Sequence, residues 1–197
     1  LGLFFSLLIS ASFAYSKDYY VGSAVWNLPP CSGLYTLPAN KVYKCSGVVE
    51  LSVRDNIYSS STSTLVATGG VVLRGSNNIQ GQSNKKLGLE GDIYSYSNTE
   101  LNHVIFTGNI RSQNYIDIDN SDVSGTLTTD YGYVKVNYST GNIADIFSHS
   151  GIWMDGAHVT GDITTRNNIV SLKNVSGGVG DIDSQSGVWA ENSTIEG

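Results

Sequence analysis

The phrase SGIWMDGAHVTG at residues 150–161 returns without a gap as SGVWAENSTIEG at residues 186–197. Both copies end on an apolar residue, one spacer and a glycine, and this ending recurs from Leu89 onward, with Ser139 and Gly178 in the apolar position of two copies. Its glycines follow one another at steps of 17, 17, 16, 20, 19 and 17 residues: Gly91, Gly108, Gly125, Gly141, Gly161, Gly180 and Gly197. A short period of this kind indicates a repeat protein.

Apolar and polar residues alternate within each unit, which is typical of strands with one buried and one solvated face. A unit of about 17–18 residues holds two or three short strands and cannot bury an apolar face alone. The sequence therefore predicts an all-β fold, a single-stranded right-handed parallel β-helix (β-solenoid). Equivalent strands of successive coils are expected to pair in parallel about 4.8 Å apart.

This register predicts internal ladders of aliphatic side chains. One contains Ile93, Ile110, Leu127, Ile143, Ile163 and Ile182, and another contains Phe106, Val123, Val159 and Ile195. A second apolar pair precedes the turns, as in Ile116 with Ile118, Ile152 with Met154 and Val188 with Ala190. Asp92, Asp162 and Asp181 follow turn glycines where other units carry Asn109, Asn142 or Thr126. Because Asn and Asp both bond to the backbone in turns, we expect a turn-stabilising role there.

The start of the chain has the pattern of a secretory signal peptide, residues 1–14. Its uncharged apolar run is too short to span a bilayer, and Ser12 and Ala14 are the small residues of a cleavage site. We expect that a basic segment preceding Leu1 is missing and that the repeat continues beyond Gly197. Residues 15–72 are expected to form an N-terminal cap and residues 73–197 the solenoid, with a less regular coil near Gly75.

Cys31 and Cys45 enclose a turn-rich segment. In an exported chain such a pair is expected to form a disulfide, here within the cap. No Cys or His lies at ligand spacing beside them and no Cys-x-x-Cys is present, so we expect neither a metal site nor a redox role.

Charge narrows the possible partners. The chain has 11 Lys and Arg against 17 Asp and Glu, a formal charge of -6, which argues against nucleic acid. No second apolar run is long enough to cross a membrane, and no cofactor is expected. The mature protein is thus expected to be secreted, periplasmic or on the cell surface.

The stretch from Leu89 to Gly197 resembles the β-solenoid families, most closely the bactofilin-type polymer-forming proteins, which are rich in phrases like GAHVTGDI at residues 156–163. The resemblance implies the architecture and, as one alternative, a self-assembling scaffold. Because bactofilins are cytoplasmic, the signal peptide and the cysteine pair fit a bacterial surface or pilus-associated protein better. Pectate-lyase-like enzymes share the general fold with longer coils.

Carboxylates are the candidates for catalysis in a solenoid that cleaves polysaccharides. Asp117 and Asp119 are expected to point outward from one strand, and Asp183 from another. The three histidines, His103, His149 and His158, are not spaced to share a metal. We expect no enzyme, with a carbohydrate-active lyase or hydrolase as the alternative.

The candidate binding residues are Trp153 and Trp189, which lie between inward-facing neighbours at equivalent positions two coils apart. Exposed rings of this kind stack on sugars or anchor protein partners. The opposing interpretation is that the insertion at residues 144–147 folds over Trp153. The sequence favours a structural or adhesive surface protein that binds a glycan or a protein, with self-association as a further expectation. Tyrosines offer an extension of the same face, although tyrosine is also common in strands: Tyr94, Tyr96, Tyr115, Tyr131, Tyr133 and Tyr138.

Overall fold

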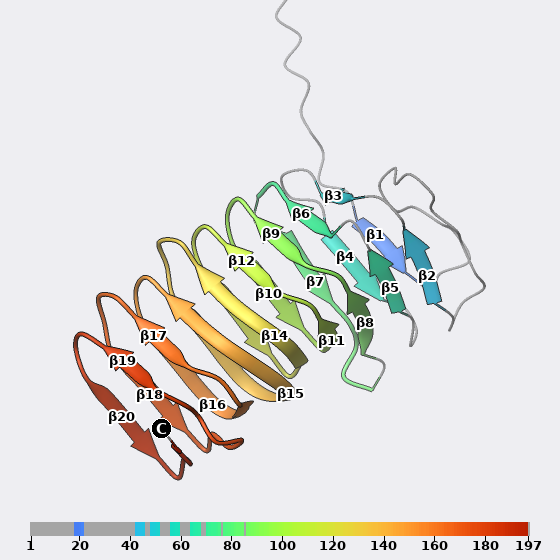
Figure 1. Ribbon diagram of the computed structural model, residues 1–197. Helices are drawn as coiled ribbons and strands as arrows, with labels where there is room; N and C mark the ends of the chain where they lie inside the picture. Colours follow the sequence, from blue (N-terminus) through green and yellow to red (C-terminus); the bar gives the residue numbers. More distant parts are fainter. Residues whose placement is uncertain are drawn as a thin grey trace, which may run out of the picture.

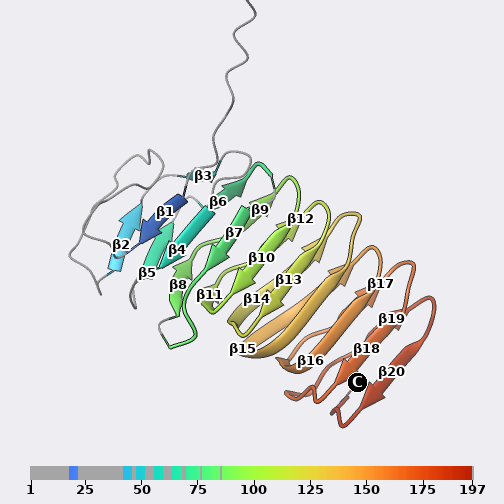
Figure 2. The ribbon, with the colours of Figure 1, turned by 180° about the vertical axis from the view of Figure 1, so that it is seen from behind.

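The computed structural model describes residues 18–21, 42–45, 48–51, 56–59, 64–67, 70–75, 77–84 and 86–196. These residues form short strands and turns, with no helix among them, and the strands wind into coils that stack along one axis (Figure 1 and, from behind, Figure 2). The pairings between these strands are parallel. The predicted all-β parallel β-solenoid is confirmed.

The strands of the coils lie on three faces. The first face contains β1 (Asp18–Val21), β4 (Asn56–Ser59), β7 (Asn77–Gln80), β10 (Thr99–Asn102), β13 (Ile116–Asp119), the starts of β15 (Val134–Ser148) and β16 (Ile152–Val159), β18 (Val170–Lys173) and β20 (Val188–Glu191). The second contains β2 (Val42–Cys45), β5 (Thr64–Ala67), β8 (Leu87–Glu90), β11 (Val104–Thr107), the start of β14 (Asp122–Thr129), the middle of β15 and the end of β16. The third contains β3 (Val49–Leu51), β6 (Val71–Leu73), β9 (Ile93–Ser95), β12 (Ile110–Ser112), the ends of β14 and β15, β17 (Ile163–Thr165) and β19 (Ile182–Ser184).

The register confirms the predicted coil length from Thr99 onward and shows longer coils before it. On the first face one ladder advances by the predicted coil length at every step, through Ile116, Val134, Ile152, Val170 and Val188. Upstream, Ile57, Ile79 and Leu101 follow one another at wider steps. A repeat defined by regularly spaced glycines therefore becomes visible only from Leu89 onward.

Strands within residues 15–72 continue these ladders. β1, β2 and β3 pair with β4, β5 and β6, which pair in turn with β7, β8 and β9. The region expected as a cap thus contributes coils of its own, and Gly70 rather than Gly75 precedes the strand that aligns with Ile93. The predicted signal peptide and the predicted disulfide lie outside the described residues. They concern residues 1–14, Cys31 and the side chain of Cys45.

The core is a stack of aliphatic side chains, and one predicted rung of it was wrong. The third-face ladder runs through Ile93, Ile110, Leu127, Ile146, Ile163 and Ile182. Ile146 replaces the expected Ile143, which is buried on the second face and pairs with Val159. The register shifts by two residues between Ser139 and Ile143, so Ala144 and Asp145 rather than Gly141 and Asn142 stand opposite Gly161 and Asp162, which is why the glycine steps of 16 and 20 depart from the period.

Two corners of the coil depend on left-handed backbone. Gly91, Gly108 and Gly125 have φ angles of 127°, 147° and 132°, and a Cβ on any of them would collide with a backbone carbonyl of the preceding coil. The corner between the first and second faces also has positive φ, here mostly without glycine: His103, Asn120, Tyr138, Gly156, Asn174 and Asn192. Asparagine tolerates this conformation better than most residues, so it recurs there.

We expect Leu127→Ala to lower the free energy of unfolding by about 2–5 kcal/mol, because it leaves a cavity in a continuous ladder. The neighbouring outward residue provides the control, since Thr128→Ala is expected to change stability by no more than about 0.5 kcal/mol. Urea unfolding followed by circular dichroism measures both. Equal losses in the two variants would contradict the inward position of Leu127.

Candidate functional site

The outward side chains of the first face form two columns along the axis. The first column contains Asn78, Glu100, Asp117, Lys135, Trp153, Ser171 and Trp189. The second contains Gln80, Asn102, Asp119, Asn137, Asp155, Lys173 and Glu191. The parallel register thus gathers residues that are far apart in the chain onto one surface.

Trp153 and Trp189 stand in the same column with Ser171 between them, as the alternation predicted. Two rungs place them about 10 Å apart. Trp189 is 50% exposed, whereas Trp153 is half-buried. Their outward direction is confirmed, and the two rings differ in how much of their surface is covered.

Trp153 is covered in part by its neighbours on the same face. Its ring meets that of Tyr133 edge to face, with centroids 5.7 Å apart at 77°. Its six-membered ring also lies against Gly151, where an added Cβ would stand 2.5 Å from Cη2. The insertion at 144–147 does not supply this cover, because Phe147 lies on the third face under Arg166, whose Cζ is 5.1 Å from the ring centroid.

A short aromatic stack adjoins Trp153. The rings of Tyr115 and Tyr133 are parallel within 3°, with centroids 5.0 Å apart. Backbone bonds from Ile116 N–H to Tyr133 and from Val134 N–H to Gly151 place the three turn residues in one column. Gly151 therefore occupies the rung where a third tyrosine would stand, and the indole of Trp153 fills that space.

Buried hydroxyls hold the turns that carry this stack. The Ser112 hydroxyl donates to the carbonyl of Tyr115 at 3.0 Å, and the Ser148 hydroxyl donates to the carbonyl of Gly151 at 3.1 Å. Equivalent hydroxyls end each third-face strand from Ser95 on: Ser95, Ser112, Thr129, Ser148, Thr165 and Ser184. This hydroxyl ladder rigidifies the corner beside the first face, because a buried donor and acceptor satisfy each other there.

A shallow groove of about 430 Å³ continues the first face beyond the aromatic stack. Its polar lining comprises Asn78, Gln80, Glu100, Asn102, Asp117, Asp119, Lys135 and Asn137. Lys135 Nζ is 3.7 Å from Asp117 Oδ2, and Asn120 Nδ2 donates to Asp119 Oδ2 at 2.7 Å. The Tyr115 hydroxyl donates to Glu100, so the stack and the groove are joined directly.

Burial and neighbouring charges shift the pKa of Asp117, the acid at the centre of the groove. Burial raises the pKa of Asp117, and Glu100 and Asp119 raise it further, while Lys135 opposes them. Burial also raises the pKa of Tyr115, with Glu100 adding to the effect, so its hydroxyl remains a donor at neutral pH. The groove therefore contains more negative charge than Lys135 offsets.

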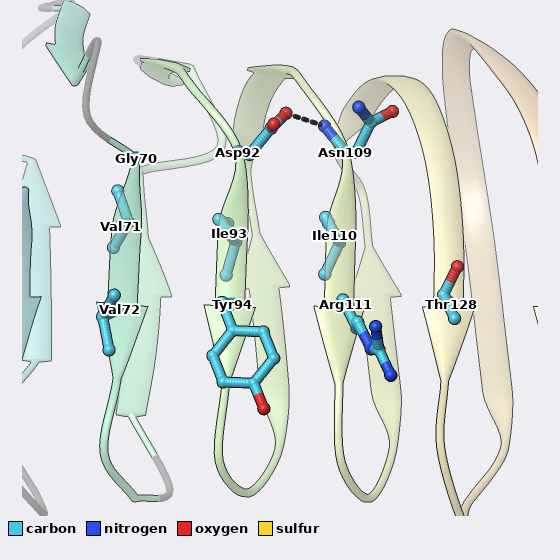
Figure 3. Close-up of a pocket in the computed structure, with 10 residues that line it drawn as sticks. All are labelled: Gly70, Val71, Val72, Asp92, Ile93, Tyr94, Asn109, Ile110, Arg111 and Thr128. Atoms are coloured by element: carbon cyan, nitrogen blue, oxygen red, sulfur yellow. Dashed lines mark hydrogen bonds between the residues drawn. The ribbon is translucent and has the colours of Figure 1, made fainter.

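The third face has a smaller hollow of about 280 Å³, in which Val72, Tyr94, Arg111 and Thr128 stand side by side (Figure 3). Its two charged side chains are already engaged. Arg111 Nη2 lies 3.0 Å from Asp130 Oδ1, and Asp92 Oδ1 accepts the N–H of Asn109 at 2.7 Å. The first-face groove has four charged side chains, Glu100, Asp117, Asp119 and Lys135, and therefore offers more groups for a ligand than this hollow.

The aspartates after the turn glycines bond to the backbone of the next coil, as expected. Asp92 Oδ1 accepts the N–H of Asn109, and Asp162 Oδ1 accepts the N–H of Asp181 at 3.0 Å. In the irregular coil Asp145 takes this position, because its Oδ1 accepts the N–H of Asp162. The backbone N–H of Asn142, which the sequence placed here, instead donates to the Ser124 hydroxyl.

The remaining candidates are scattered. Asp183 points outward on the third face, away from the Asp117–Asp119 groove. His149 Nε2 lies 2.9 Å from Asn167 Nδ2 and His158 Nδ1 lies 3.2 Å from the Ser176 hydroxyl, while His103 is a corner residue. Within the described ranges, no three His, Cys, Asp or Glu side chains are grouped to hold a metal ion.

Sequence reasoning missed Glu100 and did not show which tyrosines adjoin the tryptophan. Glu100 stands one repeat period before Asp117, so the spacing carried a signal for it, but Thr99 interrupts the apolar pair that marks this strand in later units. The hydroxyl ladder did leave a signal, because a Ser or Thr stands two residues after the aliphatic residue of each unit, as in Ile110-Arg111-Ser112.

Comparison with protein-family models, with curated proteins and with solved structures found no match to this chain. The part of the chain that the structure describes contains no helix long and apolar enough to cross a membrane.

A pair of substitutions tests the turn role of Asp162. Asp162→Ala is expected to cost about 0.5–1.5 kcal/mol of unfolding free energy, since it removes the acceptor for the Asp181 N–H. Asp162→Asn retains an acceptor oxygen and is expected to stay within about 0.5 kcal/mol of the unsubstituted protein. Urea titrations provide the measurement. A large loss in the Asn variant would mean that the charge itself is needed.

Proposed function

We propose that this protein is an exported, non-catalytic bacterial surface protein that binds a glycan through its first face. The proposal is carried by Trp153 and Trp189, which point outward from one column in line with the polar groove. Aromatic rings bind the apolar faces of sugars, and amide and carboxylate groups beside them bind sugar hydroxyls. An exposed tryptophan on a rigid sheet loses little entropy on binding.

A glycan array tests this function. We expect the unsubstituted protein to bind a subset of glycans, and Trp153→Ala with Trp189→Ala to weaken that binding by about tenfold or more. Ile105→Ala is the matched control, because it removes an exposed apolar side chain from the second face and is expected to leave binding unchanged. Binding that is unaffected by both tryptophan substitutions would contradict the proposal.

One observation favours glycan cleavage as a second candidate. Asp117 and Asp119 point outward from one strand with backbones about 7 Å apart, and hydrolysis by an acid and a base requires two carboxyl groups on one surface. Release of reducing ends or unsaturated products from polysaccharides, abolished by Asp117→Asn, would establish this activity and refute the non-catalytic proposal. Filaments in negative-stain microscopy would instead support the self-assembling scaffold.

We further propose that Cys31 and Cys45 form a disulfide in the exported protein, which the apolar segment at residues 1–14 and the paired cysteines support. Alkylation of the denatured protein without reductant is expected to modify neither cysteine, and reduction is expected to expose two sites. Intact-mass spectrometry reads both states. Modification of both cysteines before reduction would contradict the bridge.

A further inference from the structure

The outward surface of the first face has an excess of carboxylates. Lys135 and Lys173 are its described cations, whereas five acids occupy the same two columns: Glu100, Asp117, Asp119, Asp155 and Glu191. Both lysines form loose ion pairs with an aspartate: Nζ lies 3.7 Å from Oδ2 for Lys135 with Asp117 and 3.9 Å for Lys173 with Asp155. The face therefore keeps a net negative charge.

Within the groove this charge is only partly compensated. Glu100 accepts a hydrogen bond from the Tyr115 hydroxyl, and Asp119 accepts one from the Asn120 amide. In the described part of the chain neither carboxylate forms an ion pair. These bonds leave further acceptor sites, because a carboxylate has about four lone-pair directions. A cation with several N–H donors, placed between Asp117 and Asp119, would complement the charge and the free acceptors together.

The distance between Trp153 and the groove sets the size of the ligand. Asp117 and Trp153 are two rungs apart in one column, with Lys135 between them, so about 10 Å separates their backbones. A single sugar ring cannot stack on Trp153 and reach Asp117 at the same time. The ligand that uses both is a chain of sugars lying along the solenoid axis.

We propose that the first face binds a glycan chain with free, protonated amino groups, its ammonium groups at Asp117 and Asp119 and another of its sugars on Trp153. This inference rests on the proposed glycan-binding function and adds the class of glycan. An ammonium donates three hydrogen bonds and forms charge-assisted pairs with carboxylates. Uronate or sulfated chains would meet repulsion from the same acids, which gives the face a means of discrimination.

The experiment compares two probes of equal length, a fully deacetylated glucosamine oligosaccharide and its fully N-acetylated counterpart, by isothermal titration calorimetry. We expect the deacetylated chain to bind at least about tenfold more tightly at low salt. The difference is expected to shrink in about 0.5 M salt, because surface charges are screened at short range there.

Matched variants separate the groove from the overall charge of the protein. Asp117→Asn with Asp119→Asn is expected to remove the preference for the deacetylated chain, so that the two probes bind within about twofold of each other. Asp181→Asn with Asp183→Asn makes the same change in net charge near the third face and is expected to keep the preference. Loss of the preference in both double variants would overturn the proposal, since it would show attraction by net charge alone.

The outcomes distinguish the two proposals. Equal binding of both probes, or tighter binding of an oligouronate, overturns the amino-sugar inference and leaves the glycan-binding function standing if Trp153→Ala still weakens the interaction. If neither probe binds but another glycan on the array binds in a tryptophan-dependent way, the amino-sugar inference is likewise overturned and the glycan-binding function stands. Failure of all glycans overturns both proposals, and tryptophan-dependent capture of a protein partner instead would assign the face to protein recognition.

Discussion

The parallel hydrogen bonding between successive coils is the constraint on which the rest of this structure depends. A single coil of about 18 residues has too little interior to be stable, so its backbone N–H and carbonyl groups must be satisfied by the coils on either side. The bonds from Thr99 to Tyr115, from Ile116 to Tyr133 and from Val134 to Gly151 repeat this connection three times in a row at one corner. Because the bonds join equivalent positions, they also fix the register of every side chain.

Because the register is fixed, equivalent residues of successive coils line up in columns along the axis. Inside, the columns are aliphatic and buried, as at Ile110 and Leu127. At the corners one column is the hydroxyl ladder. Another consists of residues with left-handed backbone, among them Asn120 and Asn174. The same rule on the outside places Glu100 over Asp117 and Trp153 in line with Trp189, although no short motif contains these pairs.

The first face differs from the others in what its columns present. Its groove contains three carboxylates and several amides and adjoins an aromatic stack held by buried hydroxyls, whereas the third-face hollow contains one carboxylate and one guanidinium that are bonded to other protein groups. A rigid, polar and partly aromatic strip on a long axis suits an extended ligand better than a compact one. This shape and this charge connect the proposed glycan binding with the preference for amino groups.

The sequence by itself determined the class of fold, the coil length from Thr99 onward, the inward aliphatic residues and the outward direction of Trp153 and Trp189. These follow from local alternation and from the recurrence of glycine, which act within one coil. Only the tertiary structure decided that Ile146 takes the rung expected for Ile143, that residues upstream of the clear repeat form longer coils, and that Tyr133 packs on Trp153 while the Tyr115 hydroxyl donates to Glu100. The physical reason is that contacts between coils depend on the exact register, and an insertion of two residues changes the register without changing the local pattern.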